Sequence, residues 1–274
     1  MEKEKYIINP SELTYICHHC AHLKHNFKLE DRGISAGITG ELDSLEKDFF
    51  LGDVKRLNNN ISEGKIIDAG HKNESFVSKV LHDNKKRPFR IKGKGDALIE
   101  FKDKTHGIID YKTSKFKDKN GRNYTKELLK KIKEYDRQLH CYDLLYSNLE
   151  TDTEYLEKTD KGVAMKWPEK TIKKRVTEKV EHIKKISINK TTLLGLVFVY
   201  PEKINKDKSL NINFSFAYQN VEYIPVNFMK FLTDYIDKLE QKKPPPIPAE
   251  CKNPKASQHC VMHSYFYDEK KLKN

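Results

Sequence analysis

The sequence contains no apolar run that approaches the roughly 18 residues needed for a membrane-spanning helix. Residues 1–6 are charged and lack the apolar core of a signal peptide, so we expect a cytoplasmic protein. No internal repeat is apparent, and only a few Lys-rich patches approach low complexity. Without a membrane span, a signal peptide or a repeat in the sequence, a folded globular protein is the starting hypothesis.

The chain has 274 residues, enough to bury a sizeable core as one large domain or two small ones. Hydrophobic residues make up 37% of it, and 34% of the residues are charged, which predicts a strongly ionic surface. Lys and Arg number 52 against 40 Asp and Glu, giving a formal charge of +12. This balance favours a polyanionic partner such as nucleic acid. AT-rich coding bias also produces a Lys-, Asn- and Ile-rich chain, so charge does not identify the partner.

Hydrophobic periodicity predicts an interleaved order of helices and strands. We expect helices over 11–23, 41–51, 124–149, 170–185 and 228–239, and strands over 89–91, 97–101, 107–111, 193–200 and 212–226. Residues 53–87 are poorly periodic, with a helix indicated around 76–81. In the helix over 41–51, Leu42, Leu45, Phe49 and Phe50 are expected to face inward. This order predicts an α/β or α+β fold around one mixed sheet flanked by helices.

Chemistry concentrates in residues 95–115, where two predicted strands are joined by a polar turn over 102–106. Residues two apart in a strand share a face, so Asp110 and Lys112 point the same way. Asp96 on the neighbouring strand can approach Asp110. Two carboxylates suit a Mg²⁺ ion, and a nearby lysine suits activation of a water molecule and stabilisation of phosphate charge. An isolated Asp-x-Lys also occurs by chance on solvated hairpins, so its context decides its weight.

That context resembles the RecB-like branch of the PD-(D/E)XK nuclease superfamily. Members have a Gly-Asp strand followed by a strand that ends in Asp-Tyr-Lys-Thr, and here Gly95-Asp96 precedes Asp110-Tyr111-Lys112-Thr113. A Gln-x-x-x-Tyr motif follows on the next helix, matched by Gln138 and Tyr142, which lie on one helix face. The resemblance implies metal binding by Asp96 and Asp110, water activation by Lys112, and substrate positioning by Gln138 and Tyr142. By itself, the last pair is equally compatible with packing.

The family also takes a metal ligand from an earlier helix, where a His or an acid is usual. The corresponding stretch, Gly40-Glu-Leu-Asp-Ser-Leu-Glu-Lys, contains no His. Asp43 is therefore the candidate for the third ligand, and Glu41 is the second choice. The alternative is that both acids belong to a solvated first turn that the helix dipole favours.

Four of the five cysteines form two pairs near opposite ends of the chain: Cys17 and Cys20, then Cys251 and Cys260. Two such pairs suit Zn²⁺ or an iron–sulfur cluster, while free thiols are the plain alternative. Some RecB-like nucleases, including CRISPR-associated exonucleases, carry a four-Cys iron–sulfur staple, although with one Cys near the start and three near the end. His18, His19, His259 and His263 are possible replacements for a thiolate. Cys141 lies within a predicted helix and is interpreted as a packing residue.

The resemblance implies one restriction-endonuclease-like domain over 1–274, with 1–30 and 247–265 joined by a cysteine-bound 4Fe–4S cluster or Zn²⁺. It also implies a Mg²⁺- or Mn²⁺-dependent nuclease that acts on single-stranded DNA or duplex ends, in repair, recombination or defence. A CRISPR-adaptation exonuclease is an alternative within this class, with a helicase or an adaptation protein as partner. A catalytically silent nucleic-acid-binding module is the alternative from another class. The order of Asp96, Asp110, Lys112, Gln138 and Tyr142 favours an enzyme.

Overall fold

The computed structural model describes residues 4–15, 17–27, 37–68, 75–113, 125–204 and 212–248. Its helices are α1 (Glu12–Tyr15), α2 (His18–Phe27), α3 (Gly37–Phe50), the 3-10 turn η1 (Val54–Arg56), α4 (Thr125–Ser147), α5 (Thr153–Thr159), α6 (Lys161–Ala164), α7 (Glu169–Ile186) and α8 (Pro225–Leu239). Its strands are β1 (Tyr6–Ile8), β2 (Gly64–Asp68), β3 (Phe76–Val77), β4 (Leu81–His82), β5 (Pro88–Gly93), β6 (Ala97–Phe101), β7 (His106–Thr113), β8 (Thr191–Ile204) and β9 (Ile212–Val221).

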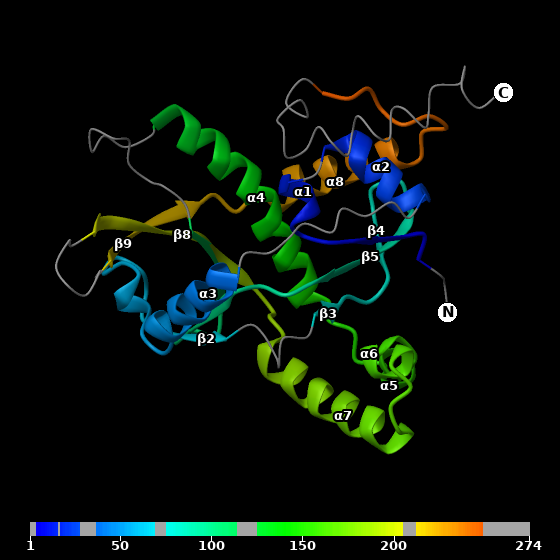
Figure 1. Ribbon diagram of the computed structural model, residues 1–274, viewed down its shortest axis with the longest axis horizontal. Helices are drawn as coiled ribbons and strands as arrows, with labels where there is room; N and C mark the ends of the chain where they lie inside the picture. The colour runs from blue at the N-terminus through cyan, green and yellow to red at the C-terminus, as the bar shows by residue number, and fades with distance from the viewer. Residues whose placement is uncertain are drawn as a thin grey trace.

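The main sheet has five strands in the order β2-β6-β7-β8-β9. Strands β7 and β8 are parallel, and the connection between them contains α4 to α7, whereas the other neighbouring pairs are antiparallel. A parallel pair needs a long crossover, and α4, the longest helix of that connection, lies across the sheet (Figure 1). The sheet is therefore mixed, as the sequence predicted.

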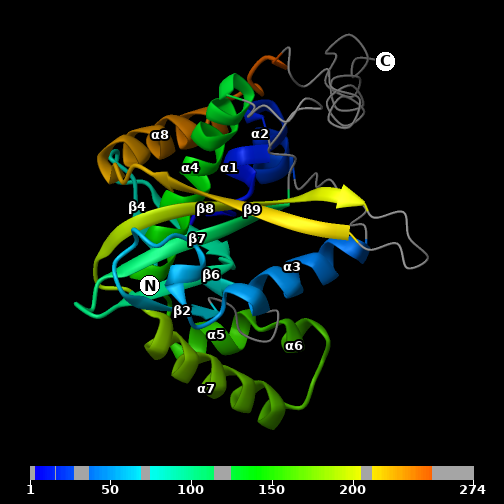
Figure 2. The same cartoon turned by 90° about the vertical axis from the view of Figure 1, so that its left-hand side faces the viewer.

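Helices cover both faces of this sheet (Figure 2). Because side chains alternate along a strand, Ile108 of β7 packs in the core beneath α4 and α8, while Ile109 packs on the opposite face with Phe50 of α3. This layered mixed α/β architecture agrees with the restriction-endonuclease-like core expected from the resemblance. Helices α5 to α7 form a further group beside the sheet, held partly by Leu156 and Val176.

A second, smaller sheet was not predicted. In it β5 pairs with β1, β3 and β4, so the expected strand over 89–91 is present but does not join the main sheet. The helix predicted around 76–81 is wrong, because β3 and β4 occupy its two ends and both pair with β5. Backbone pairing with a strand distant in the sequence outweighs the weak local helical pattern.

The other predicted helices and strands are present, with shifted ends. The helix expected over 11–23 is two helices, α1 and α2. In α3, Phe50 is buried as predicted, but Leu45 and Phe49 are exposed, and Glu46 faces inward instead. The inward stripe of α3 thus runs through Glu46 and Phe50, four residues apart on one face. The side chain of Leu42 lies outside the described residues.

None of the described helices combines the length and the apolar character that crossing a membrane requires.

Candidate active site

The β6–β7 hairpin brings the two predicted carboxylates together. Its turn is closed by Asp103, whose Oδ1 accepts from the Thr105 backbone N–H at 2.9 Å. The pairing of Ala97 with Ile109 fixes the register, and continuing it by one residue sets Asp96 opposite Asp110. Asp96 lies just before β6 rather than within it, and its Oδ2 accepts from the Tyr111 backbone N–H at 2.9 Å. The side chain of Asp96 is thereby anchored beside that of Asp110.

Asp110 is a carboxylate in the interior, with 1% of its surface exposed. Burial raises the pKa of Asp110 to about 7; Lys112 opposes this shift, and the Asp96 carboxylate adds to it. Lys112 Nζ lies 2.6 Å from Asp110 Oδ2. A buried carboxylate beside a second carboxylate is electrostatically unfavourable unless positive charge is supplied. A bound cation supplies that charge.

Residues of α4 hold Lys112 in place from the other side. Its Nζ donates to Gln138 Oε1 at 3.1 Å and lies 4.6 Å from the centroid of the Tyr135 ring. Gln138 Nε2 in turn donates to the Tyr142 hydroxyl at 3.1 Å. Gln138 and Tyr142 are both almost fully buried, so their described contacts favour a role in positioning Lys112 over direct contact with a substrate. Substrate contact by these two residues stays a prediction.

Gly95 is required by the close approach of α4. Its backbone N–H donates to the Tyr146 hydroxyl at 2.8 Å, and a Cβ at this position would lie 3.0 Å from Cε2 of the same ring. Tyr146 is fully buried and has little room to move. This contact fixes the backbone immediately before Asp96, so the Gly-Asp pair has a geometric reason.

Helix α3 contributes two further side chains that the sequence did not single out. Glu46 is buried, and its Oε1 accepts from the Thr113 hydroxyl at 3.0 Å, one residue beyond Lys112. Lys47 Nζ lies 3.2 Å from Asp96 Oδ1. The side chains of the predicted third ligands, Asp43 and Glu41, lie outside the described residues. A signal for Glu46 existed in its spacing, since it precedes the inward Phe50 by four residues.

The carboxylates suit a hard divalent cation better than a soft one. Mg²⁺ and Mn²⁺ take oxygen ligands and are commonly held by one or two carboxylates, with water and phosphate oxygens completing the shell. Asp96 and Asp110 provide such a pair, and the raised pKa of Asp110 indicates a place where a cation would relieve repulsion. Within the described residues, no three His, Cys, Asp or Glu side chains converge closely enough to hold a metal ion. The residues present fit a two-carboxylate site.

The first cysteine pair lies where α2 begins. Cys17 accepts the Ala21 N–H through its carbonyl, and the Cys20 N–H points at Cys17 Sγ at 3.5 Å. Both side chains are partly buried, whereas Cys141 is fully buried in the core, as predicted for a packing residue. Cys251 and Cys260 lie outside the described residues.

The C-terminal segment nevertheless approaches the helix that follows Cys17. His19 Nδ1 lies 2.7 Å from the Pro245 carbonyl oxygen, and His22 Nε2 lies 2.8 Å from that of Gln241. His19 is therefore engaged with the backbone. These contacts hold residues 241–245 against α2, a few residues before Cys251.

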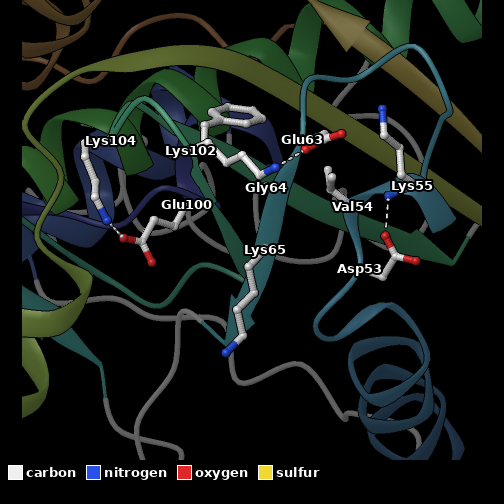
Figure 3. A pocket seen from close by; sticks show the side chains of 10 residues that line it. Asp53, Val54, Lys55, Glu63, Gly64, Lys65, Glu100, Lys102 and Lys104 are labelled. Carbon is white, nitrogen blue, oxygen red and sulfur yellow. Dashed lines mark hydrogen bonds and ion pairs between the residues drawn. The ribbon is translucent and has the colours of Figure 1, made fainter.

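A hollow of about 510 Å³ lies elsewhere, at the far end of β6 (Figure 3). Lysines and acids alternate around it, and two of these lysines, Lys102 and Lys104, pair with Glu63 and Glu100. Asp96 lies just before the other end of β6, about 17 Å away along the strand. Two ion pairs account for four of its seven charged side chains, and the carboxylate–lysine cluster is the better candidate site.

Comparison with known proteins identifies the family of this chain. No curated protein matches the chain closely enough to count as a relative. The crystal structure of SSO0001 is similar over 89% of this chain and 80% of its own, at 15% sequence identity and a TM-score of 0.40. The family model of the PD-(D/E)XK nuclease superfamily matches residues 28–251, a range that contains α3, the hairpin and α4. The chain belongs to the PD-(D/E)XK nuclease superfamily.

Proposed function

We propose that this protein is a Mg²⁺- or Mn²⁺-dependent deoxyribonuclease whose active site is the cluster of Asp96, Asp110 and Lys112. The observation that carries the proposal is the convergence of two carboxylates and a lysine at one end of a sheet, in a chain of a nuclease superfamily. The formal charge of +12 supports a polyanionic substrate.

Asp96 and Asp110 would hold the cation, and Glu46 of α3, which contacts Thr113, is our candidate for a third carboxylate that orients the site without coordinating the cation directly. A bound divalent cation supplies a coordinated water of lowered pKa and neutralises charge on the scissile phosphate. Lys112 orients the attacking water and stabilises the negative charge that develops on the phosphate oxygens. Gln138 and Tyr135 keep its ammonium group aimed at the carboxylates.

The direct test compares cleavage of single-stranded DNA, duplex DNA and RNA in Mg²⁺, Mn²⁺ or EDTA. Wild type should cut DNA only with a divalent cation, and Lys112→Ala should lower the rate about 100-fold or more. Lys242→Ala, which removes an exposed lysine just beyond α8, is the matched control and should keep the wild-type rate. Cleavage that survives EDTA, or that Lys112→Ala leaves intact, would overturn the proposal, as would wild-type protein that binds DNA without cutting it.

We further propose that the chain is one nuclease domain whose ends, 1–30 and 247–265, are joined by a metal centre on Cys17, Cys20, Cys251 and Cys260. The contacts of His19 and His22 with residues 241–245 support it, because they bring the C-terminal segment to the helix that carries Cys20. Metal analysis and visible absorption of protein purified without oxygen distinguish iron–sulfur from zinc. Replacing any one of these four cysteines with Ser should cause loss of the metal, whereas Cys141→Ser should keep it. Metal-free wild-type protein would contradict the staple without touching the nuclease proposal.

A further inference from the structure

Exposed aromatic side chains gather on α3 and β9. Phe49 is 55% exposed, Phe214 43% and Phe216 38%. We call these three residues the aromatic patch. Three exposed phenylalanines that lie together are unusual, because each of them leaves apolar surface in contact with water.

Two rings of the aromatic patch, those of Phe49 and Phe216, are held in place from beneath. The centroids of Phe49 and Phe216 are 6.2 Å apart, and each lies 4.9 Å from the buried ring of Phe50 in an edge-to-face arrangement. Phe50 stacks on Tyr111 at 5.4 Å, with an angle of 14° between the rings. Tyr111 stands between Asp110 and Lys112 in β7. The exposed rings thus rest on the strand that carries the catalytic residues.

The sheet register places the aromatic patch at the active-site end. Thr113 pairs with Val199 of β8, and Val199 pairs with Phe216 of β9. Residues aligned across strands share a face, so Phe216 lies on the same face as Thr113, about 10 Å away across two strand spacings. Thr113 contacts Glu46, which lies three residues before Phe49 in α3. Asp110 and Lys112 point to the other face of β7, and α3 connects the two, since its Lys47 lies 3.2 Å from Asp96 Oδ1 and its Phe49 belongs to the aromatic patch. The aromatic patch therefore borders the candidate active site through α3.

The chemistry of this surface fits nucleotide bases. Flat aromatic faces stack on bases of any sequence, and the Arg56 guanidinium, 5.9 Å from the Phe49 ring centroid, adds positive charge for a phosphate. Paired bases hide their faces within the duplex, so only unpaired nucleotides can use such rings. We propose that the aromatic patch binds unpaired bases of the substrate beside the cleavage site. This inference rests on the proposed nuclease function and names single-stranded nucleic acid as the form that is held there.

The test measures binding by fluorescence anisotropy in Ca²⁺, with a labelled oligothymidylate and a blunt duplex hairpin as probes. The Phe49→Leu/Phe216→Leu double variant keeps apolar bulk but loses the aromatic faces. It should bind the single strand about 10-fold or more weakly, because stacking of bases on the two rings is lost, and should bind the hairpin about as wild type does. Phe27→Leu, which changes a phenylalanine of similar exposure at the end of α2, is the matched control and should change neither affinity.

Unchanged single-strand affinity in the double variant would overturn the inference, and so would an equal loss for both probes. A wild-type dimer that the double variant dissociates in sedimentation velocity would also overturn it, because the patch would then be a protein interface. Failure here is distinct from failure of the nuclease proposal. Wild type that cuts DNA while the double variant still binds the single strand refutes only the patch. Selective loss of single-strand binding in a protein that cuts nothing refutes only the enzyme.

Discussion

At the scale of single residues, the candidate site is organised around the burial of Asp110. A carboxylate removed from water is costly unless charge and hydrogen bonds compensate for it. Lys112 supplies one positive charge at 2.6 Å, yet burial still raises the pKa of Asp110 to about 7. Lys47 plays the corresponding part for Asp96 at 3.2 Å. Two lysines thus face two carboxylates. A cation can bind to the carboxylates, and the phosphate of a substrate can then pair with the lysines.

The identity of the third carboxylate is a prediction at this scale. Glu46→Gln keeps the size of the side chain and an oxygen for the Thr113 hydroxyl, but removes the charge. We expect it to raise the Mg²⁺ concentration needed for half-maximal cleavage about tenfold or more, because a carboxylate that binds or orients the metal is lost. The measurement is a Mg²⁺ titration of the cleavage rate.

Two variants sharpen this comparison. Asp48→Asn changes an exposed acid two residues along α3 and should leave the Mg²⁺ requirement unchanged. Asp43→Asn tests the ligand predicted from the sequence. A wild-type Mg²⁺ requirement in Glu46→Gln, together with a raised requirement in Asp43→Asn, would assign the ligand to Asp43 instead.

At the scale of elements, another buried acid joins three helices. Glu12 of α1 is 1% exposed and accepts from Lys24 Nζ at 2.7 Å and from the Tyr235 hydroxyl at 3.1 Å. His25 Nε2 lies 2.8 Å from the same carboxylate. Burial alone would raise the pKa of Glu12, but His25 and Lys24 outweigh it and hold the pKa below its usual value. The cluster connects α1, α2 and α8 through charge, with no part in the candidate chemistry.

This cluster predicts a pH-dependent contribution to stability. Because the folded-state pKa of Glu12 is lowered, its contribution is fully present above the usual carboxyl pKa and is lost as the pH falls through the folded value. Glu12→Gln should lower the free energy of unfolding by about 3 kcal/mol near neutral pH, since it leaves the Lys24 ammonium group without its acid. The difference from wild type should shrink in acid. Urea unfolding over a pH series measures it, and a difference that is constant with pH would rule out the charge as its cause.

At the scale of the whole molecule, the two ends of the described chain meet on α2. His19 and His22 contact the carbonyls of Pro245 and Gln241, and Asn26 Nδ2 donates to that of Leu239 at 2.8 Å. A helix near the start of the chain thereby holds the segment that follows α8 (Figure 1). Bringing the ends together in this way costs more chain entropy than a local contact does, because the loop that it closes is long.

Removing these contacts should release the C-terminal segment. The His19→Leu/His22→Leu variant is expected to expose residues 241–248 to limited proteolysis, because two carbonyls lose their ring partners. His18→Leu changes an exposed histidine of the same helix and serves as the control. Mass spectrometry of the first fragments gives the readout. Equal cleavage in wild type and double variant would show that the histidines do not secure the segment.

The sequence by itself determined the features that depend on neighbouring residues. Strand alternation set Asp110 and Lys112 on one face, the polar turn predicted the hairpin, and four-residue spacing aligned Gln138 with Tyr142 on α4. Only the tertiary structure decided which face of α3 is buried, because that depends on Tyr111 and Phe216 in strands distant along the chain. Glu46 therefore proved to be buried, and Leu45 and Phe49 proved to be exposed. The small sheet around β5 was decided in the same way, since pairing between distant strands leaves little trace in local periodicity.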